Sequence, residues 1–406
     1  VCKTPGIVGS GVLKGLVNEA FVHRALTANR AGGMTWEGAV AAGLGEESPR
    51  TRPRVGYVGE LDAMTMECGK VVETDHTDLI RCMVEVGRWV VTGCADGTVK
   101  AWNQSSGACE ATVQAHDHGV SSMTECGGLL VTGSWKSIKV WEPGSEWTCT
   151  RTLEGHTDWV NALVVDGDTL LSGSQDKTIR LWNRSTWECE RTVQTEHSGQ
   201  HGVISLAVHD GRVCSGGGPG DHSIRVWDRA TWQCVKVLRG HTSTVTQMVV
   251  GQGKLISASF DKSIKVWGLV TAEGRGGECE RTLEGHTKEV TSIAVCGSKL
   301  LSGSTDQSIR VWELGGEWGP ACTLTVHCNN TVKALVCTRD GQRVLSCGQD
   351  KTIRVWQLDG TLENTFELHT NTECSSLFAL VAMPDNQHAL TGLHDIKLFD
   401  VNDGAV

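Results

Sequence analysis

The chain has 406 residues, more than a single hydrophobic core usually serves. Its net charge is −10, from 37 basic and 47 acidic residues, and it contains no run of 18 apolar residues. We therefore expect neither a nucleic-acid-binding protein, which would carry a basic excess, nor a membrane span. Glycine is abundant (49) and proline is scarce (7), which favours many short strands joined by tight turns.

Residues 1–65 do not share the pattern of the rest of the chain and are predicted to form an N-terminal extension. Apolar residues recur at helical spacing over about 10–30, which predicts a helix, and residues 43–54 have the composition of a linker. The first 33 residues are slightly basic, faintly like an organelle transit peptide. We expect the protein inside the cell, in the cytoplasm or in an organelle.

One unit of about 40 residues recurs eight times between residues 75 and 400. Its clearest copy, residues 155–182, reads GHTDWVNALVVDGDTLLSGSQDKTIRLW, and close copies begin at Gly240 and Gly285. Each unit opens with a histidine, and most end on a tryptophan. The eight histidines are His76, His116, His156, His197, His241, His286, His327 and His369.

Three short runs with a period of two follow each histidine, and a fourth run follows each tryptophan, as in CERTVQ from Cys189. Alternation of this kind over a few residues predicts β-strands, and four strands make one propeller blade. The last unit ends at Phe399, too late for a fourth strand. Residues 66–74 precede the first unit and read like an outer strand, so we predict that they close the ring of a propeller spanning 66–406.

The Gly-His opening, the closing Trp and the period near 40 resemble the WD-repeat family. The resemblance implies an all-β fold, an eight-bladed WD-repeat β-propeller with a short, partly helical N-terminal extension. The short inner strands are similar to those of propellers in F-box ubiquitin-ligase receptors and myosin heavy-chain kinases. The implied function is a non-catalytic scaffold or adaptor that binds other proteins, as a subunit of a multi-protein complex. The alternative is a substrate receptor, reading phosphopeptides, of a ubiquitin-ligase or kinase system.

The resemblance also implies a hydrogen-bonded tetrad of His, Ser, Asp and Trp inside a blade. Its members are expected at His156, Ser172, Asp176 and Trp182; His241, Ser257, Asp261 and Trp267; His286, Ser302, Asp306 and Trp312; and His327, Ser346, Asp350 and Trp356. A set that recurs in blade after blade indicates structure, so we expect no catalytic residue, cofactor or metal. Blades two, four and eight depart from the pattern and are expected to be looser.

The chain has 17 cysteines and no C-x-x-C motif, which argues against a disulfide framework and against a zinc site. We expect reduced, packed thiols, although Cys337 and Cys347 are placed to face each other within one blade.

Two positions in each blade are implied to lie on one face of the propeller, called the top face here. The predicted partner-binding residues are Arg81, Trp135, Trp159, Asn161, Gln175, Phe260 and Lys333. Trp135 and Trp159 are expected to form an exposed aromatic anchor; alternatively, Trp135 fills the gap left by the missing Asp of its blade. On the opposite face, tryptophans either pack in hairpins or form an aromatic ring: Trp147, Trp187, Trp232 and Trp318.

Overall fold

The computed structural model describes part of the chain. The described residues are 70–72, 78, 80–103, 108–144, 146–268, 270, 275–314, 322, 324–328, 331–338, 340–348, 352–367, 379–382, 388–392 and 396–400. The secondary-structure elements within these ranges are all β-strands. The described residues contain no helix that is long and apolar enough to cross a membrane. The predicted extension, residues 1–65, with its helix and linker, lies outside the described residues.

The strands of the first half of the ring form four antiparallel blades. Blade one contains β2 (Ile80–Val86), β3 (Trp89–Cys94), β4 (Thr98–Asn103) and β5 (Cys109–Gln114); blade two contains β6 (Ser122–Cys126), β7 (Leu129–Gly133), β8 (Trp135–Glu142) and the start of β9 (Thr148–Asp166). Blade three contains the end of β9, β10 (Thr169–Ser174), β11 (Thr178–Asn183) and β12 (Cys189–Gln194); blade four contains β13 (Val203–His209), β14 (Arg212–Gly217), β15 (Ile224–Asp228) and β16 (Cys234–Leu238).

The second half repeats the arrangement. Blade five contains β17 (Val245–Gly251), β18 (Lys254–Ser259), β19 (Ile264–Trp267) and β20 (Cys279–Leu283); blade six contains β21 (Val290–Cys296), β22 (Lys299–Ser304), β23 (Ser308–Glu313) and β24 (Leu324–His327). Blade seven contains β25 (Val332–Cys337), β26 (Arg343–Gly348), β27 (Thr352–Gln357) and β28 (Leu362–Glu367); blade eight contains β29 (Ala379–Ala382), β30 (His388–Gly392), β31 (Ile396–Asp400) and β1 (Lys70–Val72).

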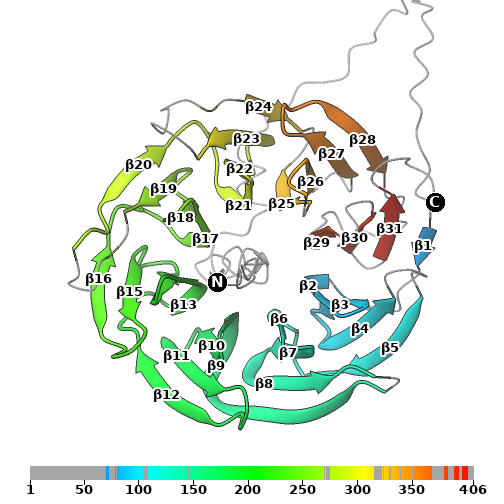
Figure 1. The fold of residues 1–406 in the computed structure, drawn as a ribbon, viewed down its shortest axis with the longest axis vertical. Coiled ribbons are helices and arrows are strands. Elements are labelled where there is room, and N and C mark those ends of the chain that lie inside the picture. Colours follow the sequence, from blue (N-terminus) through cyan, green and yellow to red (C-terminus); the bar gives the residue numbers. More distant parts are fainter. Residues whose placement is uncertain are drawn as a thin grey trace, which may run out of the picture.

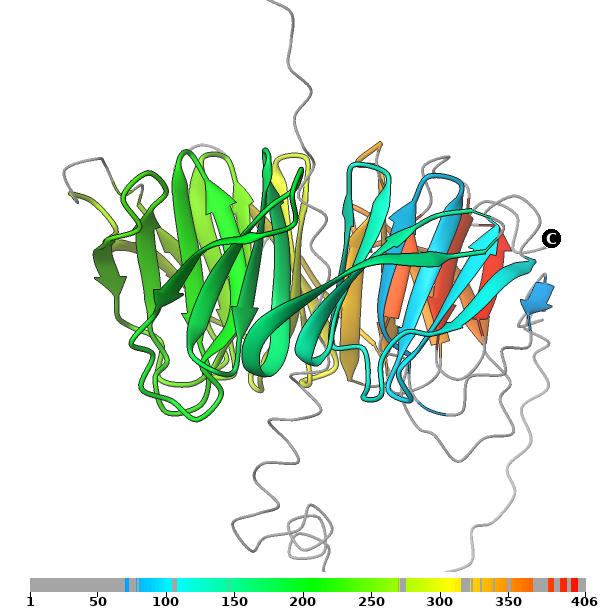
Figure 2. The same cartoon turned by 90° about the horizontal axis from the view of Figure 1, so that it is seen from below.

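The eight blades of the described chain form a closed ring (Figure 1). The innermost strands contact one another in the cyclic order β2, β6, β9, β13, β17, β21, β25, β29 and back to β2. β1 pairs antiparallel with β31, with Lys70 opposite Leu398, so that strands from the two ends of the repeat region share one blade. Seen from the side, the strands run between two opposite faces that carry the turns (Figure 2). Closure removes the long open sheet edge that invites aggregation.

Neighbouring blades are joined by apolar side chains, which explains why the inner strands are buried on both sides. β10 is buried from its second residue onward, whereas the outer strand β12 is exposed at five of six positions. Trp147 of blade two packs edge-on against Trp89 of blade one, with ring centroids 5.5 Å apart. Trp147 and Trp232 are 6% and 9% exposed, so these two pack between blades and do not form an aromatic surface. Trp318 lies outside the described residues.

A serine hydroxyl joins the histidine and the tryptophan inside the blade. In blade five the Oγ of Ser257 lies 2.7 Å from Nε2 of His241 and accepts a hydrogen bond of 2.8 Å from Nε1 of Trp267. Nδ1 of His241 lies 2.7 Å from a carboxylate oxygen of Asp261. Since a carboxylate only accepts hydrogen bonds, the imidazole carries its proton on Nδ1. Blades three and six have the same arrangement, with every distance between 2.7 and 2.9 Å.

The tetrad aspartates of blades three, five and six have pKa values well below the ordinary range. Burial by itself would raise the pKa of Asp261, but hydrogen bonds from His241, Ser263 and the backbone of Thr242 together outweigh it. The ionised aspartate is therefore stabilised in the folded state. Its contribution to the free energy of unfolding is complete at neutral pH and is lost as the pH falls below the value at which an unfolded aspartate becomes protonated.

Blade four contains a fourth complete tetrad, beyond those predicted from the sequence. Its members are His197, Ser215, Asp221 and Trp227, with distances of 2.7 to 3.0 Å. The expanded turn before Asp221 lengthens the His-to-Asp spacing to 24 residues, from 20 in blade five, and hides the match. In blade seven Trp356 donates to Ser346 over 2.8 Å, whereas Asp350 and the side chain of His327 lie outside the described residues.

A disulfide joins Cys296 of β21 to Cys337 of β25, with the two Cα atoms 5.6 Å apart. It corrects the expectation of reduced thiols for these two residues, and it corrects the pairing considered within blade seven. Cys337 points across the joint to blade six, whereas Cys347 lies opposite Ala334 in its own sheet. The bond closes a loop of 41 residues, so it covalently links two neighbouring blades.

We expect Ser257→Ala to lower the free energy of unfolding by about 2 to 4 kcal/mol, because it leaves the buried imidazole and indole of His241 and Trp267 without their shared partner. Urea denaturation followed by tryptophan fluorescence measures the loss. Ser185→Ala, in an exposed turn, serves as the matched control and should change stability little. Equal effects of the two substitutions would contradict a central role for the tetrad hydroxyl.

Reduction of the disulfide should destabilise the protein by up to about 4 kcal/mol, the chain-entropy value for a loop of this length. Thermal unfolding with and without dithiothreitol measures the effect as a fall in Tm. The double variant Cys296→Ala, Cys337→Ala should unfold at the same Tm in both conditions. A wild-type Tm that does not respond to the reductant would contradict the prediction.

Candidate functional site

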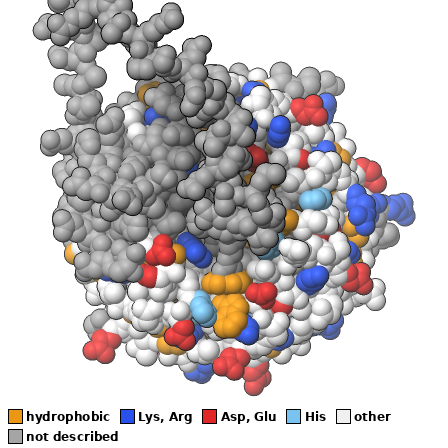
Figure 3. Space-filling view, turned by 180° about the vertical axis from the view of Figure 1, so that it is seen from behind, with side chains coloured by type: hydrophobic (Ala, Val, Ile, Leu, Met, Phe, Trp, Pro, Cys, Tyr) orange, Lys and Arg blue, Asp and Glu red, His pale blue; other side chains and the backbone are white. Residues whose placement is uncertain are grey.

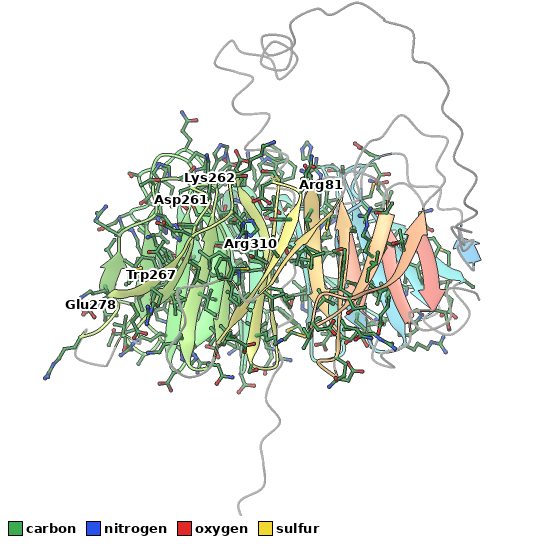
Figure 4. All side chains as sticks on the ribbon, turned by 90° about the horizontal axis from the view of Figure 1, so that it is seen from above. Arg81, Asp261, Lys262, Trp267, Glu278 and Arg310 are labelled. Atoms are coloured by element: carbon green, nitrogen blue, oxygen red, sulfur yellow. A yellow bond between two sulfur atoms is a disulfide. The ribbon has the colours of Figure 1, made fainter. Side chains whose placement is uncertain are left out.

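The top face carries the loops that enter each blade and the turns between the second and third strands. Figure 4 labels Asp261 and Lys262 of such a turn at the upper edge of the propeller, and Arg81 lies near the same edge. Asp261 is held within its tetrad by His241. The groups left for recognition are therefore those side chains of this face that the tetrads do not use.

Blade two differs from its neighbours because its turn lacks the aspartate. Between Ser134 and Ile138 the chain is one residue shorter than between the equivalent Ser174 and Ile179 of blade three. Ser137 keeps the contact that its counterpart makes in blade three: its Oγ lies 3.1 Å from Nδ1 of His116, as Thr178 lies 3.2 Å from Nδ1 of His156. Trp135 is 39% exposed, so it is not buried in the gap left by the aspartate.

Trp135 is directed to solvent, with 39% of its surface exposed. It begins β8 and pairs with Trp159 on β9, which runs without interruption from blade two into blade three. The ring of His118 packs edge-on against Trp135 at 4.7 Å and lies 6.1 Å from Trp159. Lys136 places its ammonium group 3.9 Å from the centre of the Trp135 ring, a favourable cation–π distance.

We call the group of Trp135, Trp159, His118 and Lys136 the aromatic patch. Figure 3 shows exposed hydrophobic side chains gathered beside a histidine on this face. Gln175 borders the patch, because its backbone N–H donates to the carbonyl of Trp159. The structure thus brings together three of the predicted partner-binding residues: Trp135, Trp159 and Gln175. His118 and Lys136 were not singled out from the sequence, although both lie within two residues of motif positions.

Asn161 is placed inside the propeller. Its side chain is 4% exposed, and its Nδ2 donates to the carbonyl of Val203 in blade four over 3.0 Å. Equivalent residues make the same link from one blade to the next: Ser121 to Val160, Thr246 to Val290, and Thr291 to Val332. This position therefore links neighbouring blades, and the buried Asn161 is not part of the candidate binding surface.

Phe260 and Lys333 belong to blades five and seven and are not part of the aromatic patch. Phe260 is half-buried and packs against Ile204, which holds the blade-linking position of blade four. An apolar contact thus stands where other blades use a hydrogen bond. Lys333 is partly buried on β25 and interacts within the protein.

A cavity of about 460 Å³ lies on the opposite face between blades three and four, lined by Leu171, Leu181 and Trp232 and bordered by charged groups. Those charges have partners: Arg229 pairs with Asp166, Asp228 with Arg212, and Glu190 accepts from Asn183. The cavity therefore has an apolar floor and a rim whose charged groups are engaged within the protein.

His116 of blade two should make the stability of the protein sensitive to mild acid. Burial, reinforced by the charge of Lys139, lowers its pKa to about 3. In the unfolded state His116 takes up a proton near pH 6.5, whereas in the folded state it does not. Its contribution to the free energy of unfolding is therefore complete above pH 6.5. It should fall by about 1.4 kcal/mol per pH unit as the pH drops from 6.5 towards 3.

Urea denaturation at several pH values between 7.5 and 5 tests this behaviour. In His116→Gln the fall in the free energy of unfolding should be smaller by about 2 kcal/mol at pH 5. An unchanged pH dependence in the variant would show that His116 is not responsible.

Comparison with known proteins agrees with the ring of repeated blades. A family model described as "WD domain, G-beta repeat" matches residues 67–103, 107–142, 147–183, 232–268, 277–313 and 318–357, together more than half of the chain. The unmatched stretches include the expanded turn of blade four and the strands β29, β30 and β31 of blade eight. No curated protein matches the chain significantly.

Among solved structures, the crystal structure of the computationally designed Ika8 protein is similar in fold, with a TM-score of 0.68 and 25% sequence identity. The similarity covers 83% of this chain and 99% of that one. Repeats of the matched family generally mediate contacts between proteins. The period of the sequence, the tetrads, the closed ring of blades and the family match lead to one conclusion: this chain belongs to the WD40-repeat family.

Proposed function

We propose that this protein is a non-catalytic scaffold or adaptor, a subunit of a multi-protein complex inside the cell, and that it binds a partner through the aromatic patch. The observation that carries the proposal is the exposure of Trp135. The closing tryptophans of the blades, such as Trp182 and Trp267, are 2% and 1% exposed. An indole 39% exposed beside a second indole leaves apolar surface that a partner can cover.

The chemistry of the patch suits a protein surface. Large aromatic side chains are the groups that most often dominate the energy of protein interfaces, since they bury much apolar area with little loss of conformational freedom. His118 and Lys136 place polar groups beside the indoles, as expected at an interface that is exposed before binding. The β8–β9 pairing, which begins at Trp135 opposite Trp159, supports both indoles on paired backbone.

Affinity capture from cells of the natural source, read by quantitative mass spectrometry, tests the proposal. The double variant Trp135→Ala, Trp159→Ala should lose its specific partners, because truncation of an interface tryptophan commonly costs about 2 kcal/mol or more. Leu362→Ala is the matched control: Leu362 is 45% exposed but lies on β28, the outer strand of blade seven.

The fold of each variant is checked first by circular dichroism and thermal unfolding. Partners that are retained by Leu362→Ala and lost by the tryptophan variant support the proposal. The same partners on both variants would place the binding surface elsewhere.

A further inference from the structure

The guanidinium of Arg81 differs from the other residues at the blade-linking position. In blades two, three, five and six this residue donates a hydrogen bond to the next blade, as Thr291 does to the carbonyl of Val332 over 2.7 Å. Arg81 holds this position in β2 of blade one. Its Nε and Nη1 are buried, and the structure supplies no hydrogen-bond partner for either.

Buried polar groups in folded proteins almost always have partners, so two unpaired donors on one charged group require an explanation. The charge of Arg81 is not used in the tetrads or in any ion pair among the described residues. Arginine remains charged at all physiological pH values and presents its donors in a planar fork that matches a carboxylate. A carboxylate supplied by a partner would match this pair of donors.

The guanidinium lies next to the aromatic patch. A Cβ atom placed on Gly119 would lie 3.1 Å from Nη1 of Arg81 and 2.8 Å from the carbonyl oxygen of Ala95, so only glycine fits between them. Gly119 directly follows His118, whose ring packs on Trp135. The hydroxyl of Ser134 donates to the carbonyls of both His118 and Gly119, which holds this loop in place.

We propose that Arg81 and the aromatic patch together bind a partner segment in which an Asp or Glu side chain lies a few residues from a large apolar one. The carboxylate pairs with the unpaired donors of Arg81, and the apolar side chain covers Trp135 and Trp159. Lys136 adds a second positive charge at the patch. This inference rests on the proposed function and adds the chemistry of the partner.

Selection from an unbiased display library of short linear peptides tests the inference on the full-length protein. The wild type should enrich peptides in which an acidic residue lies within about four positions of a Trp, Phe, Leu or Met, the separation over which an extended segment spans neighbouring blade loops. A selected peptide should bind Arg81→Gln about tenfold or more weakly, because a charge-assisted hydrogen bond is lost.

Three variants separate the contributions. Lys262→Gln removes one exposed top-face cation from blade five and should leave binding unchanged. Arg81→Lys keeps the charge at the blade joint but loses the fork, so it should show intermediate affinity if Arg81→Gln does not fold. Trp135→Ala should abolish enrichment of the apolar residue.

The inference is supported if Arg81→Gln loses the preference for acidic residues and Lys262→Gln keeps it. An acidic preference that survives this substitution, with apolar selection still dependent on Trp135, overturns the role of Arg81 and leaves the proposed function intact. Selection that is indifferent to both Arg81 and Trp135 overturns both.

Discussion

The fold depends on one serine hydroxyl in the interior of the blade. In blades three to six this oxygen lies within hydrogen-bond distance of an imidazole that begins the blade and an indole that ends its third strand. Because all three groups are buried, an alternative packing would leave polar atoms without partners. The hydroxyl therefore fixes the position of the entry loop, and with it the side chains that this loop presents on the top face.

Blade two shows what happens when one member of this network is absent. Without the aspartate the turn is one residue shorter, and the backbone pairs as strand as far as Trp135 and Trp159. In the blade that lacks the tetrad aspartate, the indoles of Trp135 and Trp159 thus lie side by side at the surface. The same blade holds His116, whose pKa falls to about 3 because the imidazole is buried and Lys139 lies nearby. The candidate binding surface and the acid-sensitive histidine therefore lie in the same blade.

The joints between blades vary more than the blades themselves. Hydrogen bonds from Ser121, Asn161, Thr246 and Thr291 link four joints, whereas Ile204 and Phe260 form an apolar contact at a fifth. A disulfide crosses the joint between blades six and seven. Only the joint of Arg81 has a charged side chain with buried donors that lack partners among the described residues. In our proposal, one repeated position supplies stability at most joints and recognition at the joint of Arg81.

The sequence by itself determined the repeat, the four strands of each blade and the closing pair of β1 with β31, because each depends on periods and spacings within the chain. It also indicated Trp135 and Trp159 as neighbours. Only the tertiary structure decided which top-face side chains remain available. Asn161 is used by a carbonyl of the next blade, and Cys296 meets Cys337 because neighbouring blades place their inner strands side by side. Contacts between blades join residues about 40 positions apart, and their partners depend on the twist and spacing of adjacent sheets, which no local pattern records.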